Sequence, residues 1–194
     1  MIISLYIYDI SKLIDNPILT KNILEHTSKY NNLSKRKVSE SNYHMALTKL
    51  NELNANIESF KFINGKPIID DYYISFSHND NYYGFSISKI NNGFDIEAII
   101  PDSKLEKLSK RMLKEKDYKL YNESNNKNEF LTRIWSEIEA AGKMDGCGID
   151  LKFIHPDYIY NSFKLNNNMI VISAKEDFEI ELYINDVRST IWLI

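Results

Sequence analysis

The stretch GFDIEAI, Gly93 to Ile99, places two carboxylates one residue apart in a segment that has the composition of a buried strand. Asp95 and Glu97 flank Ile96, and residues i and i+2 of a strand point to the same face. Neighbouring negative charges repel each other, and burying them without a partner costs free energy. The segment is therefore either an edge strand with a solvated polar face or part of a site that binds a cation.

The second interpretation predicts a site for a hard cation. Mg²⁺ is usually held by one or two carboxylates together with water and substrate phosphates. Glu139, in WSEIEAAGK, is the candidate for a third carboxylate, since Trp135, Glu139 and Lys143 recur at spacing four and share one helix face. The same Glu–Lys spacing also fits a surface ion pair worth roughly 0.2–0.5 kcal/mol. Glu137 is a second acidic candidate on this helix, but it lies about 160° around the helix axis from Glu139 and so on a different face.

Length and composition indicate an ordinary globular protein. The chain has 194 residues, of which 43% are hydrophobic and 26% charged, enough for a substantial core in one domain or in two small halves. A net charge of -3 argues against a general nucleic-acid binder, which would be basic. Cys147 is the only cysteine, which excludes an internal disulfide and a Cys-based zinc site.

Hydropathy argues against a membrane protein. The first residues, MIISLYIYDISKLIDN, lack the basic start and the long apolar run of a secretory signal. No stretch approaches the roughly 20 apolar residues of a membrane span. We therefore expect a soluble cytoplasmic monomer without a membrane or nucleic-acid partner.

Hydrophobic periodicity predicts strands and helices in the same order in both halves of the chain. In the first half we expect a strand at 2–8, helices at 17–30 and 34–55, a hairpin at 60–69 turning at Asn64-Gly65, and strands at 72–78, 82–90 and 93–100. After Pro101, we expect a helix at 105–121 opened by a Ser103–Glu106 capping box, a helix at 129–143, and strands within 161–194 turning at 166–168 and 185–186. This order predicts an α+β fold with an N-terminal lobe at 1–98 and a C-terminal lobe at 99–194.

A series of short motifs runs from Gly65 to Ile149. In chain order these are GKP, SFSH, GFDIE, RMLKEKDY, WSEIEAAGK and GCGI. The series resembles the 4′-phosphopantetheinyl transferase superfamily of the surfactin-synthetase-activating type. Its members typically show G-K-P, S-H-S, G-[IV]-D-[IVL]-E, R-F-F-x-x-x-E-Y, W-[ST]-x-K-E-A-x-x-K and G-K-G-L. The joint order is far more specific than any single motif.

This resemblance implies a fold, a reaction and two partners. The fold is two similar α+β lobes related by a pseudo-twofold axis, with the active site between them. The reaction is the Mg²⁺-dependent transfer of the phosphopantetheine arm of coenzyme A to a serine of an acyl or peptidyl carrier protein. Adenosine 3′,5′-bisphosphate is the product that leaves.

The resemblance also implies roles for individual residues. Asp95, Glu97 and Glu139 match the metal-binding acids of the family, and Glu139 would act as general base directly or through a metal-bound water. Lys143 and His78 match the phosphate contacts and would stabilise the departing phosphate oxygens. Ser77 belongs to the serine–histidine segment, and Lys66 matches the G-K-P lysine near the nucleotide; both are expected to bind coenzyme A.

The sequence departs from the family pattern at several positions. Ile138 replaces the usual lysine before the helix glutamate, Gly142 weakens that helix by roughly 1 kcal/mol, and Asn79 replaces a small residue on the phosphate side. An early arginine that grips the 3′-phosphate of coenzyme A is missing. His44 stands at the nearest position and is expected to bind coenzyme A there. Lys35, Arg36 and Lys37 are alternative replacements for the arginine, but a solvated turn is the favoured interpretation of these three residues.

Two functions therefore remain open from the sequence. The intact acids favour an active transferase with a weakened hold on the nucleotide. The lost arginine and lysine favour a non-catalytic relative that keeps the fold and binds carrier or synthase proteins.

Overall fold

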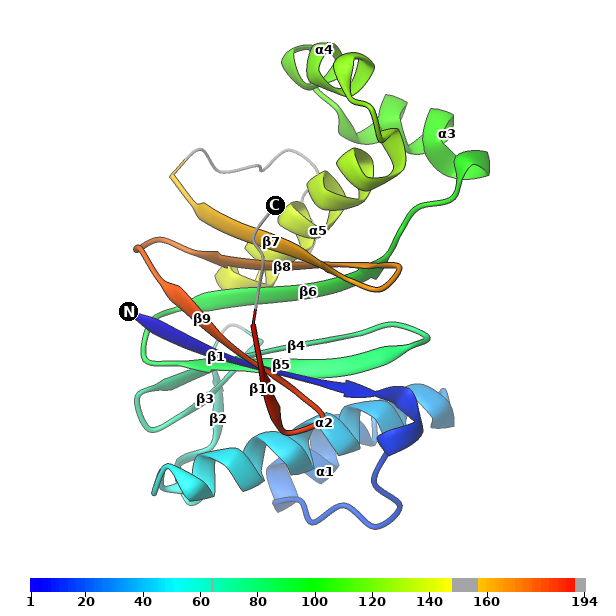
Figure 1. Ribbon diagram of the computed structural model, residues 1–194. Helices are drawn as coiled ribbons and strands as arrows, with labels where there is room; N and C mark the ends of the chain where they lie inside the picture. Colours follow the sequence, from blue (N-terminus) through cyan, green and yellow to red (C-terminus); the bar gives the residue numbers. More distant parts are fainter. Residues whose placement is uncertain (64, 148–156, 191–194) are drawn as a thin grey trace.

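The computed structural model describes residues 1–63, 65–147 and 157–190. The helices of this part (Figure 1) are η1 (Ile10–Lys12), α1 (Lys21–Thr27), α2 (Leu33–Glu52), η2 (Ile57–Ser59), α3 (Asp102–Met112), α4 (Glu115–Glu123) and α5 (Lys127–Asp145). The strands are β1 (Ile2–Asp9), β2 (Lys61–Ile63), β3 (Lys66–Ile69), β4 (Tyr72–His78), β5 (Tyr82–Ser88), β6 (Asn92–Ala98), β7 (Ile159–Leu165), β8 (Asn168–Ala174), β9 (Glu179–Ile184) and β10 (Val187–Ser189). The predicted mixture of helices and strands is confirmed.

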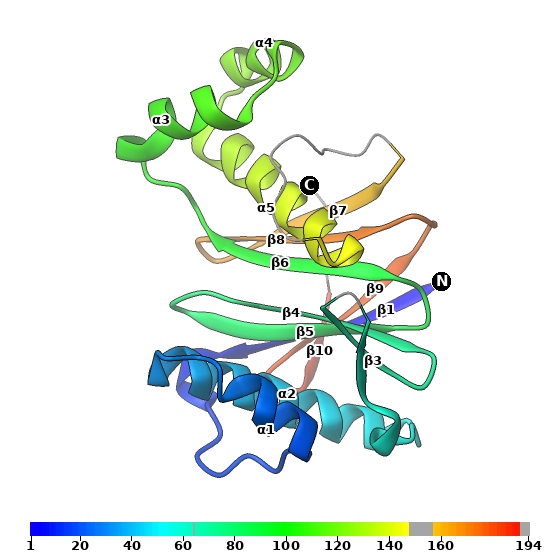
Figure 2. The ribbon, with the colours of Figure 1, turned by 180° about the vertical axis from the view of Figure 1, so that it is seen from behind.

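The strands form two sheets that face each other. The larger sheet has the order β10-β9-β1-β5-β4-β3-β2, and the smaller one has the order β6-β8-β7. Helices α1 and α2 cover the outer face of the larger sheet, and α5 covers the outer face of the smaller sheet, with α3 and α4 beyond it (Figures 1 and 2). No helix in the described part of the chain is long and apolar enough to cross a membrane.

Apolar side chains fill the space between these layers. One cluster joins α1 and α2 to the larger sheet and includes Ile23, Leu50 and Phe85. A second cluster lies between the two sheets and includes Leu5, Phe94, Ile96, Ile170 and Ile172. The sheets are therefore held together by burial of apolar surface from both halves of the chain.

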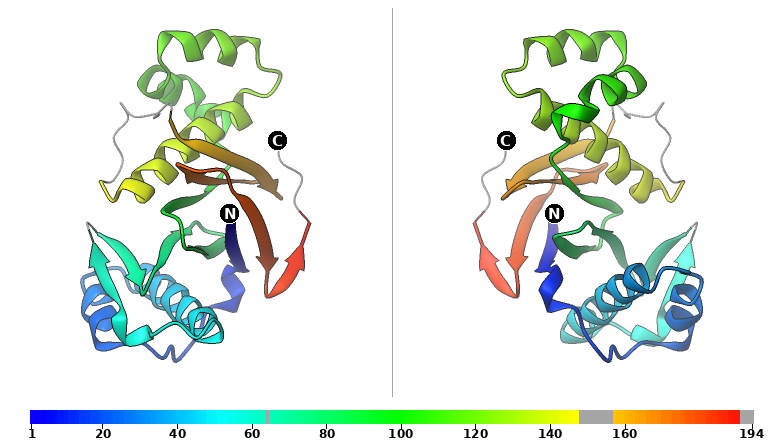
Figure 3. Two further views of the ribbon diagram at one scale, coloured as in Figure 1. Left: turned by 90° about the vertical axis from the view of Figure 1, so that its left-hand side faces the viewer. Right: turned by 90° about the vertical axis from the view of Figure 1, so that its right-hand side faces the viewer.

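Sheet membership crosses the boundary that the sequence suggested at residue 98. Strand β6, from the first half, pairs with β8, and β9, from the second half, pairs in parallel with β1. Figure 3 shows β9 and β10, in orange and red, beside the blue N-terminal strand. The division into lobes 1–98 and 99–194 and the pseudo-twofold relation between lobes stay predictions.

Most predicted elements are present, with different ends. The helix expected over 17–30 is shorter, since α1 spans Lys21–Thr27. The helix expected over 105–121 is two helices, because the chain is extended at Leu113 and Lys114 before α4 begins, and the Asp117 carboxylate accepts a hydrogen bond from the Lys114 amide. The two helices can therefore lie at an angle to each other on α5.

The predicted capping box at Ser103 is wrong. Helix α3 begins at Asp102, so Ser103 already lies inside it, and Pro101 is the N-cap residue. The side-chain amide of Asn128 donates to the Ile100 carbonyl (2.8 Å) and to Asp102 Oδ1 (2.7 Å). These bonds from α5 fix the start of α3 ahead of the predicted cap.

The predicted turns at residues 166–168 and 185–186 are confirmed. Asn166, Asn185 and Asp186 have positive φ angles of 52°, 48° and 66°, as short hairpin turns require. Strands β2 and β3 form the predicted antiparallel hairpin, although Asn64 itself lies outside the described residues. The end of the predicted GCGI turn, at residues 148 and 149, also lies outside them.

Candidate functional site

The two carboxylates of GFDIEAI lie on the face of β6 that turns towards α5. Phe94 and Ile96, which alternate with them, enter the apolar cluster between the sheets. Strand β6 is an edge of its sheet, as one interpretation of the sequence required. Asp95 is only 1% exposed, however, so this edge does not carry a solvated polar face.

A glycine lets α5 approach this strand closely. A Cβ atom on Gly93 would lie 1.8 Å from the backbone oxygen of Ala140, so any larger residue would push the helix away. Glu139 and Lys143, on the same face of α5, thereby reach Asp95. The packing of α5 against β6 at Gly93 thus brings residues 95 and 139, which are far apart in the sequence, close together in space.

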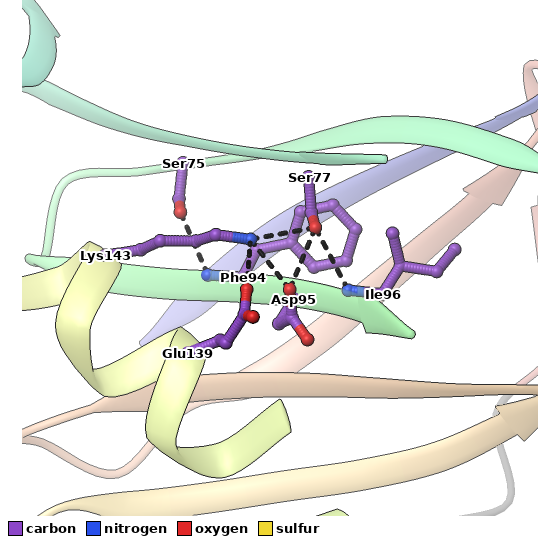
Figure 4. A network of polar contacts seen from close by, with 7 residues as sticks. All are labelled: Ser75, Ser77, Phe94, Asp95, Ile96, Glu139 and Lys143. Atoms are coloured by element: carbon purple, nitrogen blue, oxygen red, sulfur yellow. Dashed lines mark hydrogen bonds and ion pairs between the residues drawn. The ribbon is translucent and has the colours of Figure 1, made fainter. Parts of the chain in front are cut away.

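Lys143 and Ser77 hold the Asp95 carboxylate. Lys143 Nζ donates to Asp95 Oδ1 at 2.7 Å and to Ser77 Oγ at 2.8 Å, and it lies 3.9 Å from Glu139 Oε2 (Figure 4). Ser77 Oγ in turn donates to Asp95 Oδ1 at 3.0 Å and accepts from the amide of Ile96 at 3.2 Å. Strand β4 is thus fastened to β6 through a side chain that also orients the buried acid.

The acids remain short of positive charge. Burial, then repulsion by Asp95, raises the pKa of both Glu97 and Glu139 to about 7, although Lys143 acts in the opposite direction. Asp95 Oδ2 is buried and has no hydrogen-bond partner among the described residues. A further positive charge next to these carboxylates would therefore be stabilised by them.

A cavity of about 370 Å³ opens in front of these groups. It is lined by residues of β4, β6 and α5, namely Phe76, Ser77, His78, Asp95, Glu97, Glu139 and Lys143, and also by Tyr30 and by Lys35, Ser39, Asn42 and Tyr43 of α2. A second cavity, of about 520 Å³, shares Lys35, His78 and Glu97 with the first. Burial, with Lys143 and Lys35 next, lowers the pKa of His78, so this histidine offers a mostly neutral ring to the cavity at pH 7.

The carboxylate oxygens of the cavity are ligands of the type that Mg²⁺ prefers, but in the described residues they are not arranged around one point. Within residues 1–63, 65–147 and 157–190, no three His, Cys, Asp or Glu side chains form a group that could hold a metal ion. Lys143 instead occupies one oxygen of Asp95. The fit to Mg²⁺ rests on the ligand type of the Asp95, Glu97 and Glu139 oxygens and on Asp95 Oδ2, a buried oxygen without a hydrogen-bond partner among the described residues.

Lys66 and His44 lie outside the cavity. Lys66 is buried at the junction of the sheets, where its ammonium donates to the Asn92 carbonyl and burial lowers its pKa to about 7. His44 Nδ1 accepts from the Ile18 amide at 2.9 Å and lines a different cavity. Neither position supports the expected contact with coenzyme A.

Lys35 is a cavity residue, although the favoured interpretation of the sequence placed it in a solvated turn. The solvated turn expected there is wrong: residues 35–37 lie in α2, Arg36 pairs with Glu40, and Lys37 pairs with Asp15. Lys35 lines both cavities. His44 follows Lys35 by nine residues, which is about two and a half helical turns, so it points the opposite way. The spacing of Lys35, Ser39 and Asn42 was the available signal for the correct face.

Glu137 and Asn79 make contacts with other parts of the protein rather than with the three acids. Glu137 is buried beside Arg133, with 2.7 Å between Oε1 and Nη1, and does not line the cavity of the acids. Asn79 donates to Asn168 Oδ1 at 2.7 Å and so joins the β4–β5 turn to the start of β8. This bond accounts for an asparagine where the family pattern has a small residue.

Comparison with known proteins identifies the family of the chain. A family model described as the 4′-phosphopantetheinyl transferase superfamily matches residues 92–188, which is half of the chain. The matched part includes Asp95, Glu97, Glu139 and Lys143 but begins after His78. No curated protein matches the sequence significantly. The chain belongs to the 4′-phosphopantetheinyl transferase superfamily.

Proposed function

We propose that this protein transfers the 4′-phosphopantetheine arm of coenzyme A to a serine of an acyl or peptidyl carrier protein. The observation that carries the proposal is the single cavity lined by three carboxylates, two lysines and a histidine from both halves of the chain. The two α+β lobes would enclose the substrate at their junction. We further propose that the protein acts as a cytoplasmic monomer.

Asp95, Glu97 and Glu139 would hold Mg²⁺. When bound, the ion would supply charge neutralisation and orientation for the pyrophosphate of coenzyme A. The support for this assignment is the shortage of positive charge around the three acids. Lys35, which lines the same cavity from α2, would add a second cation for a polyanionic ligand.

The side chains of the cavity have complementary tasks in the transfer. The serine oxygen of the carrier protein would attack the phosphorus that bears the pantetheine arm, while Glu139 accepts the serine proton. The bond from that phosphorus to the bridging oxygen would break, and its electron pair would leave on adenosine 3′,5′-bisphosphate. With Mg²⁺ bound, Glu139 would stay ionised, which is the form that can accept a proton.

Lys143, His78 and Ser77 would face the phosphate groups. Lys143 would stabilise negative charge on the departing oxygen, and a neutral His78 would donate one hydrogen bond. Lys66 and His44 remain part of the proposal only through their place in the family pattern, because neither lines the cavity of the acids.

The test is transfer to a carrier protein. The protein is incubated with coenzyme A, Mg²⁺ and a panel of apo acyl and peptidyl carrier proteins, and each carrier is weighed by mass spectrometry. We expect the mass of one phosphopantetheine to be added to at least one carrier, and a Glu139→Gln variant to be slower by about 10²–10⁴-fold. Glu137→Gln, two residues away but outside the cavity, is the matched control and should keep the transfer.

A non-catalytic relative that binds carrier or synthase proteins is the second candidate. The observation that favours it is Lys143, which already neutralises Asp95 without a metal ion. In that case no carrier would gain mass, while pull-down with apo carriers would still detect binding. Transfer that depends on Glu139 would exclude this candidate.

A further inference from the structure

Lys143 holds a position that a metal ion would also need. Its ammonium lies 2.7 Å from Asp95 Oδ1, 2.8 Å from Ser77 Oγ and 3.9 Å from Glu139 Oε2. Asp95 is 2% exposed in its side chain, whereas Lys143 is 30% exposed. The acid is thus fixed in the interior, and the cation that neutralises it reaches in from the cavity.

We propose that Lys143 is an internal counter-cation that neutralises Asp95 in the metal-free protein and gives way when a divalent cation binds. The inference rests on the proposed function, because it assigns the divalent cation to the same acids. A divalent cation and an ammonium cannot both contact Asp95 Oδ1 without strong repulsion at such short distances. The second oxygen of Asp95 is buried and has no hydrogen-bond partner in the described part of the chain, so the carboxylate can accept a further contact once Lys143 moves aside.

The side chain of Lys143 can move without breaking the fold. A lysine ammonium sits on a flexible four-carbon stem, and its three donors can turn to other acceptors. Ser77 remains behind, since its oxygen also accepts from the Ile96 amide, so Asp95 keeps one hydrogen bond during the exchange. Because 30% of the Lys143 side chain is exposed, the displaced ammonium can turn towards the cavity.

The exchange would couple metal binding to the availability of a cation in the cavity. In the metal-free protein Lys143 is occupied by Asp95 and Ser77. Once displaced, its ammonium faces the cavity that also contains His78 and Lys35. A phosphate group would therefore meet the Lys143 ammonium free of Asp95 only after the divalent cation has bound, whereas Lys35 faces the cavity in either state.

The test is calorimetric titration of the full-length protein with Mg²⁺ alone, without coenzyme A. Removing the competing ammonium in Lys143→Met should tighten Mg²⁺ binding by about tenfold, which is about 1.4 kcal/mol. Lys35→Met is the matched control: it removes the same charge from the same cavity, but Lys35 makes no ion pair with the acids in the described structure, so it should change the affinity by less than about threefold. Equal or weaker Mg²⁺ binding by Lys143→Met would overturn the proposal, as would a tightening that Lys35→Met matches.

A second measurement on the unaltered protein covers the case in which Lys143→Met does not fold. In protein labelled with ¹⁵N at lysine, the Lys143 ammonium resonance should shift with Mg²⁺ and reach half of its change at the calorimetric dissociation constant. A resonance that stays fixed while Mg²⁺ saturates the site overturns the proposal. If the carrier-protein assay shows transfer but either test fails, only the exchange is wrong. If no Mg²⁺ binds to any variant, the metal assignment falls together with it.

Discussion

Two serines of β4 perform similar structural tasks at different distances from the acids. Ser75 Oγ accepts from the Phe94 amide at 2.9 Å, and Ser77 Oγ accepts from the Ile96 amide at 3.2 Å. Both side chains thus satisfy amides on the free edge of β6, which would otherwise be buried without a partner (Figure 4). Ser77 alone also contacts Asp95 and Lys143.

Replacing each serine with alanine separates these tasks. Ser75→Ala leaves one buried amide unpaired, and we expect it to lower the free energy of unfolding by about 1 kcal/mol. Ser77→Ala also removes a hydrogen bond to a buried charge, and we expect a loss of about 2–3 kcal/mol. Urea denaturation of both variants measures the difference. Equal losses would show that the contacts of Ser77 with Asp95 and Lys143 contribute nothing to stability.

The titration of Glu97 and Glu139 predicts the pH dependence of stability without metal. The ordinary pKa of a glutamate carboxyl is 4.5, and in the folded protein the pKa of each of these two is about 7. Between these values the folded state binds more protons than the unfolded state, so raising the pH favours unfolding. We expect the pair to lower the free energy of unfolding by roughly 1–2 kcal/mol across this range, after allowance for solvent screening.

The measurement is urea denaturation from pH 4.5 to 8 for the unaltered protein and for a Glu97→Gln, Glu139→Gln variant. The difference between the two curves isolates the two acids. This subtraction is needed because the lowered pKa of His78 acts with the opposite sign at similar pH. A difference that is flat, or that rises with pH, would contradict the prediction. Saturating Mg²⁺ should reduce the slope, because it keeps both carboxylates ionised.

At the scale of elements, the crossing of α5 over β6 assembles the site. The helix is amphipathic and packs Ala140 against Met169 and Val171 of β8. It can do so only because Gly93 has no side chain to meet the Ala140 carbonyl. The fold and the position of Glu139 therefore depend on the same glycine.

Gly93→Ala should lower the stability of the fold and displace Glu139 from the other acids. The added Cβ would meet backbone rather than a movable side chain, so we expect a loss of about 3 kcal/mol or more in the free energy of unfolding. Gly84→Ala is the control, since its Cβ would meet the Tyr6 oxygen at 2.4 Å on a strand that carries none of the acids. Both variants should be less stable in urea, but only Gly93→Ala should lose the stabilisation by Mg²⁺. A Gly93→Ala protein of unchanged stability would refute the close contact.

At the scale of the whole molecule, hydrogen bonds between turns connect the two sheets beside the larger cavity. Asn79, next to His78, donates to Asn168, and Asn166 donates to the hydroxyl of Tyr82 at 2.6 Å. These bonds join the β4–β5 turn to the β7–β8 turn. They fix the distance between the two sheets where Glu97 and His78 line the same cavity.

Asn79→Asp tests this connection with little change to the turn. The new carboxylate can still accept from the amides of Asn81 and Tyr82, as the Asn79 oxygen does at 2.9 Å and 3.0 Å, but it cannot donate to Asn168. We expect the free energy of unfolding in urea to fall by about 1–2 kcal/mol. In an Asn168→Ala background the same change should cost less, because the partner is already gone. An equal cost in both backgrounds would show that the connection carries no energy.

Local patterns were sufficient for much of the fold. The alternation in GFDIEAI, the helical stripe of Trp135, Glu139 and Lys143, and the asparagine turns depend on neighbours a few residues away, and a sequence displays these directly. The joint order of the motifs also predicted the family, which the match over residues 92–188 confirms.

Tertiary structure alone decided which polar groups meet. Lys66 matches the family pattern, but its ammonium donates to the buried Asn92 carbonyl at the junction of the sheets and lies outside the cavity. His44 stands near a position of the pattern, but it lies on the opposite face of α2 and accepts from the Ile18 amide. Lys35, in the first turn of α2, lines the cavity together with His78 of β4, and Lys143 reaches Asp95 because Gly93 lets α5 approach β6 closely. Such contacts join residues far apart in the chain, and their free energy depends on distances that no local pattern contains.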